Sequence, residues 1–149
     1  MMFVALEFPP ESWTLSLARH AIDQLLATAQ ADDRIRGELA VVMTEACSNV
    51  VRHCGVPDPY RVRVEVLGDA CLIEVSDCGT GFDPDRIAHD MPPVEDIEAS
   101  RGLALIRALT DRLFLRRLTP RGMVLPAVKR LRHSERGPDG TAGEPRRDR

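Results

Sequence analysis

The sequence lacks a hydrophobic run of the roughly 20 residues that a membrane-spanning helix needs. Its start also lacks the basic segment followed by an apolar one that is typical of a secretory signal peptide. With a formal net charge of -3, it has no basic excess to attract nucleic acid or an anionic membrane surface. We therefore expect a cytoplasmic protein that contacts neither nucleic acid nor membrane directly.

Lysine and cysteine are scarce. Lys129 is the only lysine and does not stand in a G-x-x-x-x-G-K motif, which excludes a P-loop; the motif G-x-G-x-x-G is absent as well. The four cysteines are too few for a disulfide framework, and their spacings are not those of C-x-x-C zinc sites. We expect reduced, buried thiols rather than a structural metal. The cysteines are Cys47, Cys54, Cys71 and Cys78.

The 149 residues fit one domain, which we place at residues 1–132, followed by a disordered tail at 133–149 that is rich in Gly, Pro and charge. Alternating patterns predict strands, and apolar residues at helical spacing predict helices. The strands are expected at 2–8, 61–67, 71–75, 113–118 and 123–128, and the helices at 12–30, 33–54 and 101–112.

This order predicts an α+β fold: a two-layer sandwich in which a mostly antiparallel, mixed sheet carries three helices on one face. The N-terminal strand is expected at an edge, because Pro9 and Pro10 end it. Pro126 inside the last strand predicts that this strand is at an edge or bulged as well. Residues 82–99 carry three prolines and no clear period, so we expect a loop with at most a short helix near 85–88.

Glu45 and Asn49 stand four residues apart on the second helix, so their side chains leave it one turn apart on the same face. We expect this face to lie opposite the apolar stripe that packs in the core. An Asn carbonyl oxygen suits Mg²⁺, and a nearby Glu can accept the proton of an attacking hydroxyl. The alternative is a solvated helix face, on which such a pair is common.

The segment 77–81, Asp-Cys-Gly-Thr-Gly, directly follows an apolar strand. Gly79 and Gly81 allow the backbone to approach a flat ligand, and the Asp77 carboxylate can accept a hydrogen bond from an exocyclic amino group such as that of adenine. The alternative is an ordinary Asp-Gly turn at the end of a strand.

Ser100, Arg101 and Gly102 stand where the third helix is expected to begin, with Ser100 as its N-cap. Free N–H groups and the positive end of the helix dipole suit phosphate oxygens, Gly102 lets a phosphate approach, and Arg101 adds charge. The alternative is a helix cap without a ligand.

The order and spacing of these three clusters resemble the N, G1 and G2 boxes of GHKL (Bergerat-fold) ATP-binding domains, at residues 45–49, 77–82 and 100–103 respectively. In size the chain most resembles the anti-sigma-factor serine/threonine kinases of bacteria, over roughly residues 1–131. It departs from them at Ser100, where the family often has Gly, and in the acidic composition of the segment before it.

The resemblance implies that the protein binds ATP with Mg²⁺ and transfers phosphate to a serine or threonine of a STAS-domain anti-anti-sigma partner. Family members also sequester a sigma factor and are commonly homodimers. The implied roles are a general base for Glu45, a Mg²⁺ ligand for Asn49, an adenine contact for Asp77, close approach at Gly79 and Gly81, and nucleotide contacts for Arg101, Gly102 and Leu103.

Two classes of function follow from this sequence. The first is a kinase that also sequesters a sigma factor, and the second is a protein-interaction module without kinase activity, with or without nucleotide. Retention of both Glu45 and Asn49 favours the kinase. A sensor histidine kinase is disfavoured because the sequence shows no dimerisation helix with a phosphoacceptor histidine.

Overall fold

The computed structural model describes residues 1–78, 97–117 and 122–131. Within these ranges, strands and helices follow one another nearly as the sequence predicts. The first part contains β1 (Met2–Phe8), α1 (Thr14–Thr28), α2 (Asp33–His53), β2 (Tyr60–Leu67) and β3 (Ala70–Ser76). The remainder contains α4 (Ile97–Leu109), β4 (Arg112–Leu113), β5 (Arg116–Arg117) and β6 (Met123–Arg130).

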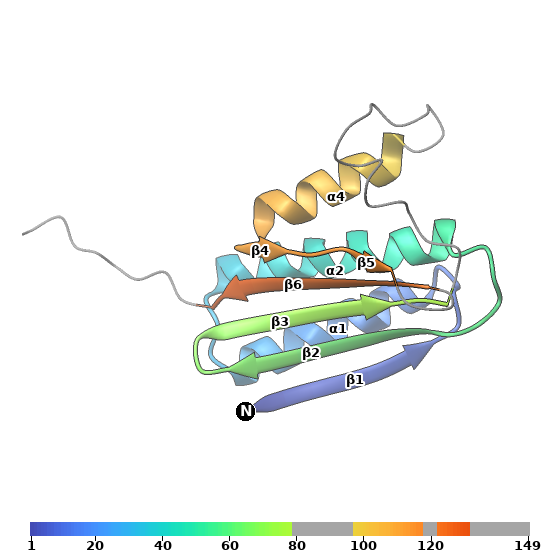
Figure 1. Cartoon of the computed structure of the whole chain (residues 1–149). Coiled ribbons are helices and arrows are strands. Elements are labelled where there is room, and N and C mark those ends of the chain that lie inside the picture. Colours follow the sequence, from blue (N-terminus) through green and yellow to red (C-terminus); the bar gives the residue numbers. More distant parts are fainter. Residues whose placement is uncertain (79–96, 118–121, 132–149) are drawn as a thin grey trace, which may run out of the picture.

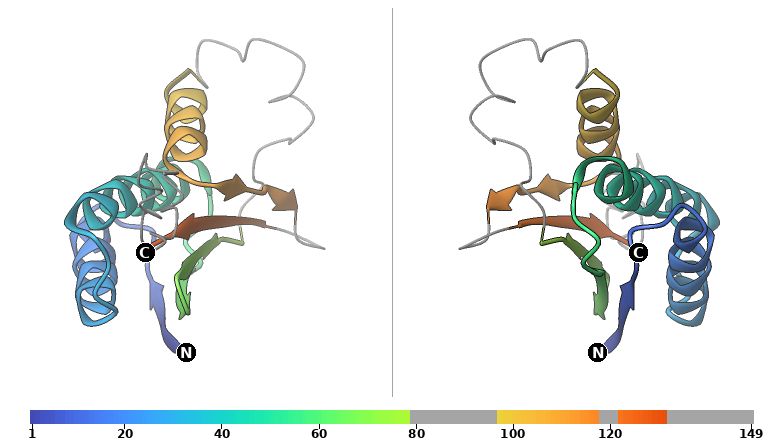
Figure 2. Two further views of the ribbon diagram at one scale, coloured as in Figure 1. Left: turned by 90° about the vertical axis from the view of Figure 1, so that its left-hand side faces the viewer. Right: turned by 90° about the vertical axis from the view of Figure 1, so that its right-hand side faces the viewer.

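The strands form one sheet in the order β1-β2-β3-β6-β4, with β5 also paired to β6. Every strand pair in the described part of the chain is antiparallel. All three helices cover the same face of this sheet, with α4 beside α2 (Figures 1 and 2). The predicted two-layer α+β fold is therefore confirmed, although no parallel pair makes the described sheet a mixed one.

The core lies between the sheet and the helices. Along β2, buried valines alternate with exposed arginines such as Arg61 and Arg63, because successive side chains point to opposite faces of a strand. Each large apolar side chain buried in this layer contributes about 1.5–3 kcal/mol. The fully buried ones include Ile22 and Leu26 of α1, Ile35 and Leu39 of α2, Ile73 of β3 and Ile106 of α4.

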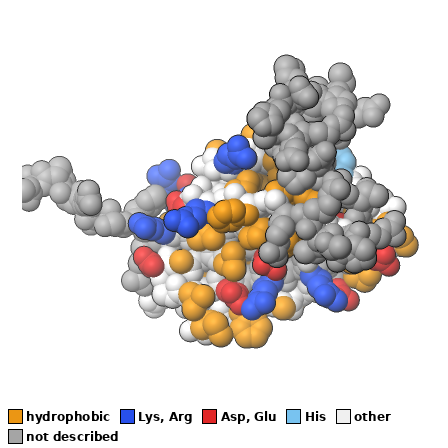
Figure 3. All heavy atoms as spheres, viewed as in Figure 1, with side chains coloured by type: hydrophobic (Ala, Val, Ile, Leu, Met, Phe, Trp, Pro, Cys, Tyr) orange, Lys and Arg blue, Asp and Glu red, His pale blue; other side chains and the backbone are white. Residues whose placement is uncertain are grey.

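The other face of the sheet is open. It carries apolar side chains interleaved with arginines and acidic residues (Figure 3). Arg61 pairs with Glu7 across β1 and β2 at 2.8 Å, and Phe3 is 59% exposed.

Glycines end two elements where the backbone turns sharply. Gly55 has a φ of +68° just after α2, and Gly68 has a φ of +58° in the two-residue turn between β2 and β3. Glycine tolerates this left-handed conformation because it has no Cβ. Both positions agree with the predicted end of the second helix and the predicted hairpin.

Helix α4 begins at Ile97, four residues before the predicted start. Ser100 therefore lies inside the helix, and its predicted role as the N-cap is wrong. Ile97, Glu98 and Ala99 are compatible with a helix, so they extend it by one turn. The short helix expected near 85–88 and the tail at 133–149 lie outside the described residues.

Strand β6 is internal and its register with β3 is uninterrupted at Pro126, so the prediction that Pro126 marks an edge or a bulge is wrong. Proline has no N–H to donate. The registers of β4 and β5 place Phe114 opposite Pro126, and the Phe114 N–H donates to the Pro126 carbonyl at 2.9 Å. Because Pro126 cannot return that hydrogen bond, the edge strand divides into β4 and β5 at this point.

Three of the four cysteines are buried, as predicted, but Cys78 is exposed because it follows the end of β3. Burial raises the pKa of Cys47 and of Cys71 to about 12 each, so both thiols stay protonated near neutral pH. Within the described residues, no helix combines the length and the apolar character needed to span a membrane.

Candidate nucleotide-binding site

Helix α2 carries Glu45, Asn49 and His53 at intervals of four residues, so the three side chains leave one side of the helix. Asn49 is only 6% exposed, and Glu45 is half-buried. The prediction that this side lies opposite the core stripe is wrong, because Asn49 lines the same cavity as Ala46 and Val50. The functional face of α2 adjoins its core face.

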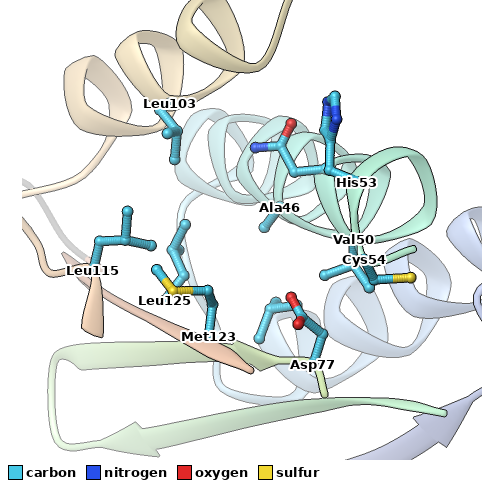
Figure 4. A pocket seen from close by; sticks show the side chains of 11 residues that line it. Ala46, Val50, His53, Cys54, Asp77, Leu103, Leu115, Met123 and Leu125 are labelled. Atoms are coloured by element: carbon cyan, nitrogen blue, oxygen red, sulfur yellow. The ribbon is translucent and has the colours of Figure 1, made fainter. Parts of the chain in front are cut away.

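This cavity lies between α2, the end of β3, β6 and α4, and we call it the chamber. Apolar side chains form most of its wall, and Asn49, His53, Cys54 and Asp77 are its polar members. Leu103 enters from α4, Met123 and Leu125 from β6, and Leu115 from the edge strand (Figure 4). It encloses about 30 Å³, which is room for one water molecule.

Asp77 stands where β3 ends, and its carboxylate points into the chamber (Figure 4). Its backbone N–H donates to the Met123 carbonyl at 3.0 Å, which continues the pairing of β3 with β6 by one residue. Carboxylate oxygens accept hydrogen bonds only, so a carboxylate facing an apolar wall suits a flat ligand that offers an amino group.

Gly102 of α4 packs directly against the Glu45–Asn49 pair. A Cβ atom added at Gly102 would lie 2.8 Å from Glu45 Oε2 and 3.4 Å from Asn49 Oδ1. A side chain at position 102 would therefore displace the Glu45 carboxylate. The contact places the backbone of α4 beside the predicted base and the predicted metal ligand.

The place of Gly102 within α4 differs from the prediction. Gly102 is the sixth residue of the helix, whereas only the first four N–H groups of a helix lack an intrahelical partner. Its N–H is therefore not one of the free donors expected for a phosphate. Of its neighbours, Leu103 lines the chamber and Arg101 is exposed.

The Asn49 side chain leaves a donor unsatisfied. Its buried Nδ2 group has no hydrogen-bond partner among the described residues. Such a group costs about 1–3 kcal/mol unless a partner is supplied. An oxygen-rich ligand satisfies it, and an amide oxygen beside a carboxylate is a donor set that Mg²⁺ accepts together with water and phosphate. The residues present therefore fit a Mg-nucleotide.

The structure thus brings together Asn49, Asp77 and Leu103 around the chamber, with Glu45 and Gly102 at its border. Arg101 does not line the chamber, and Gly79 and Gly81 lie outside the described residues. The other lining residues were given no role at the site. His53 could have been predicted from its spacing, since it repeats the four-residue interval from Glu45 to Asn49. The positions of Leu115 and Met123 at the chamber could not, because they depend on how the strands pair.

Fold and site together define a class of protein: a helix-covered antiparallel sheet with an acid–amide pair on one helix and an aspartate at the end of a strand. The chain belongs to the histidine kinase-like ATPase domain family, whose family model matches residues 8–129. The resemblance to GHKL domains is therefore confirmed. Among curated proteins, none matches the chain.

Solved structures share this fold. The chain is similar to the crystal structure of the RsbU and RsbW domains of Rv1364c from Mycobacterium tuberculosis (TM-score 0.68, 18% identity), covering 88% of this chain and 33% of that one. It is also similar to the SiaB–SiaC complex from Pseudomonas aeruginosa (TM-score 0.64, 13% identity), covering 84% and 88%. A third similar structure is the histidine kinase domain from the Erythrobacter litoralis EL346 blue-light activated histidine kinase (TM-score 0.52, 14% identity). The match covers 83% of this chain and 62% of that one.

These identities are low, so the likeness concerns the fold. The chain spans a third of the length of the Mycobacterium tuberculosis chain. Activity and partners must therefore be argued from this chain's own residues.

Proposed function

We propose that the protein is an ATP-dependent protein serine/threonine kinase of the anti-sigma-factor type. It phosphorylates a STAS-domain anti-anti-sigma partner, sequesters a sigma factor and forms a homodimer. The observation that carries this proposal is the position of Glu45 and Asn49, one turn apart on α2 and beside the chamber that Asp77 faces. A module that only bound a protein would need neither side chain.

Each side chain has a step that suits it. Asp77 accepts a hydrogen bond from the adenine amino group, and the apolar wall of the chamber packs against the base. Asn49 Oδ1 holds Mg²⁺, which supplies charge neutralisation for the phosphates when bound. Arg101 adds positive charge, and the Glu45 carboxylate takes the proton of the attacking hydroxyl.

The chamber can take only part of a nucleotide. It holds about 30 Å³, less than the roughly 300–1,000 Å³ of ligand pockets. The rest of a bound nucleotide therefore lies beyond the residues that line the chamber.

The small volume of the chamber also suits a second candidate function, a protein-interaction module without kinase activity. In that case the chamber serves only as part of the core. Two of the similar structures are a two-protein complex and a pair of domains from one protein, which suits either function.

The test is phosphate transfer from labelled Mg-ATP to a panel of STAS-domain proteins from the source organism. Wild type is compared with Glu45→Ala and Asn49→Ala, and with Gln24→Ala on the exposed side of α1 as a control. Loss of a general base lowers the rate about 10²–10⁴-fold. We expect that loss in Glu45→Ala with ATP binding retained, weaker Mg-dependent binding in Asn49→Ala, and no change in Gln24→Ala.

If wild type binds ATP but labels no protein, the interaction module is the better description. If ATP does not bind either, the assignment of the chamber as a nucleotide site is wrong.

A further inference from the structure

The two edges of the sheet differ in their protection against pairing with a further strand. At one edge, β4 and β5 are only two residues long each, and they carry Arg112, Arg116 and Arg117. Short edge strands and positively charged side chains keep a free edge from pairing. The other edge is β1, which has seven residues and contains neither proline nor a basic residue. Its register with β2 is uninterrupted, so β1 has no protective bulge either.

Strand β1 is open on its outer side. It pairs with β2 alone among the strands that the structure describes, and it forms the border of the sheet (Figure 2). In an antiparallel ladder, residues alternately direct their backbone N–H and C=O groups toward the neighbouring strand and away from it. The groups of β1 that point away from β2 therefore have no strand partner within the described ranges, and a further strand would supply one.

The core is incompletely covered beside β1. The inward-facing side chains of β2 are at most 4% exposed, whereas the four inward-facing side chains of β1 are only partly buried. These four are Met2, Val4, Leu6 and Phe8. On the open face of the same strand, Phe3 is 59% exposed. A strand added beside β1 would bury apolar surface on both faces of the sheet, which is favourable.

The inward side of β1 is complementary to itself. If two copies pair antiparallel about a two-fold axis at Ala5, all seven residues of the strand are paired. Val4 then lies opposite Leu6 of the second copy. Met2 lies opposite Phe8 in the same way. Every inward-facing pair is therefore apolar, and the hydrophobic layer continues from one copy to the other.

The open side of β1 is compatible with the same pairing. Phe3 lies opposite Glu7 of the second copy, and Ala5 lies opposite its own copy. Glu7 is the only charged residue of β1, and Arg61 of its own chain pairs with it at 2.8 Å. Like charges opposite each other would destabilise the pair, and this register has none. Such self-complementarity is what a two-fold dimer requires.

We propose that β1 is the surface through which two copies of the chain join, by antiparallel pairing of β1 with β1 centred on Ala5. The two sheets then form one continuous sheet. The inference rests on the homodimer of the proposed function and names its surface.

The first test measures the dissociation constant of the dimer by sedimentation equilibrium. Phe3→Glu places an acid opposite Glu7 of the second copy, and the two-fold axis makes this pair occur twice. We expect the dissociation constant to rise roughly tenfold or more. Phe3→Arg places the opposite charge there and should stay within about threefold of wild type. The matched control is Phe114→Glu at the other edge of the sheet, where Phe114 is 55% exposed, and it should change nothing.

The second test locates the two-fold axis by disulfide cross-linking. Opposite Cα atoms of an antiparallel pair are about 4.5–5.5 Å apart, which is within the reach of a disulfide bond. Ala5→Cys should therefore cross-link two copies under mild oxidation. Phe3→Cys should not, because its two copies are offset by four residues, about 13 Å along the strands. Both changes are made together with Cys78→Ser, which removes the one exposed cysteine.

A wild type that sediments as a monomer overturns the inference, and so does equal weakening by Phe3→Glu and Phe3→Arg. Cross-linking of Phe3→Cys in place of Ala5→Cys overturns the register. A dimer that Phe3→Glu does not weaken has another surface, which overturns the inference but not the proposed homodimer. Neither test uses phosphate transfer, and no residue of β1 lines the chamber. Failure of the proposed kinase and failure of this surface are therefore distinguishable.

Discussion

Gly122 packs against the backbone of Asp77 so closely that no side chain fits between them. A Cβ atom at Gly122 would lie 2.0 Å from the Asp77 carbonyl oxygen, and Gly122 has a φ of +104°. Asp77 is also held by the hydrogen bond from its N–H to the Met123 carbonyl, one residue beyond Gly122. The position of the carboxylate that faces the chamber therefore depends on a glycine at the start of β6.

Replacing Gly122 by Ala should displace Asp77. We expect the variant to lose about 2–3 kcal/mol of unfolding free energy, because the methyl group overlaps backbone atoms and the positive φ is unfavourable for alanine. The variant should also gain less unfolding free energy from added Mg-ATP than wild type does, because Asp77 is displaced. Thermal unfolding with and without Mg-ATP measures both.

Gly37→Ala is the matched control, since an added Cβ there meets nothing within 4 Å and Gly37 lies inside α2. This change should stabilise the protein by about 0.5–1 kcal/mol. A Gly122→Ala variant as stable as wild type would contradict the close contact with Asp77.

Local patterns were enough to predict most of the fold. The alternation in β2, the spacing of apolar residues in α1 and α2, and the turn at Gly68 each depend on residues near one another in the sequence. The family resemblance placed Asp77 and Asn49 at one site, and the structure places both on the wall of one chamber.

Apart from the start of α4 and the N-cap role of Ser100, the errors concern contacts between distant segments. Asn49 is buried because α4 packs against α2. The spacing of apolar residues in α2 alone cannot predict that a distant helix packs there. The internal place of Pro126 follows from the pairing of β6 with strands on both sides. Gly122 stands between the predicted strands 113–118 and 123–128, and its contact with Asp77 depends on the register between β3 and β6.

The pair of Glu38 and Lys129 should make stability depend on pH. Lys129 Nζ lies 2.8 Å from Glu38 Oε2 and joins α2 to β6. The hydrogen bond from Lys129, with a further one from Arg34, holds the pKa of Glu38 below its ordinary value of 4.5. A lowered folded-state pKa gives stability that is present above the unfolded value and lost as the pH falls through the folded value.

Glu38→Gln should therefore be less stable than wild type at pH 7, by about 1–2 kcal/mol. The difference should shrink as the pH falls below 4.5, because wild type then loses the same charge. Urea unfolding of both proteins across this range measures the difference. A gap that stays constant with pH would show that the carboxylate charge does not contribute.

Thr14 and Tyr60 form a buried hydrogen bond between α1 and β2, with their oxygens 2.7 Å apart. The Thr14 hydroxyl donates to the Glu11 carbonyl at 2.7 Å, so the Tyr60 hydroxyl must be the donor to Thr14. Burial raises the pKa of Tyr60, which keeps the phenol protonated. Tyr60→Phe removes only the donor and should cost about 1 kcal/mol of unfolding free energy.

Thr14→Val should cost more, because it removes the acceptor of the buried Tyr60 hydroxyl as well as one of the two hydrogen bonds to the Glu11 carbonyl, which keeps only the one from the residue 14 N–H. The double variant tests the assignment. If the hydrogen bond is real, the two changes together cost less than the sum of the single ones. Additive costs, measured by urea unfolding at one pH, would mean that the two hydroxyls do not interact.

Gln30, two residues after the end of α1, has a left-handed conformation with a φ of 57° and is the only non-glycine residue of the described ranges with a positive φ. Its N–H donates to the Ala27 carbonyl and that of Ala31 to the Leu26 carbonyl, both at 3.0 Å, as in a helix ending where glycine is usual. Gln30→Gly should raise the unfolding free energy by about 0.5–1 kcal/mol, because glycine carries no Cβ penalty there. Gln24→Gly, inside the same helix, should lower it by about 1 kcal/mol. Equal losses in both variants, measured by thermal unfolding, would mean that Gln30 does not have the left-handed conformation in solution.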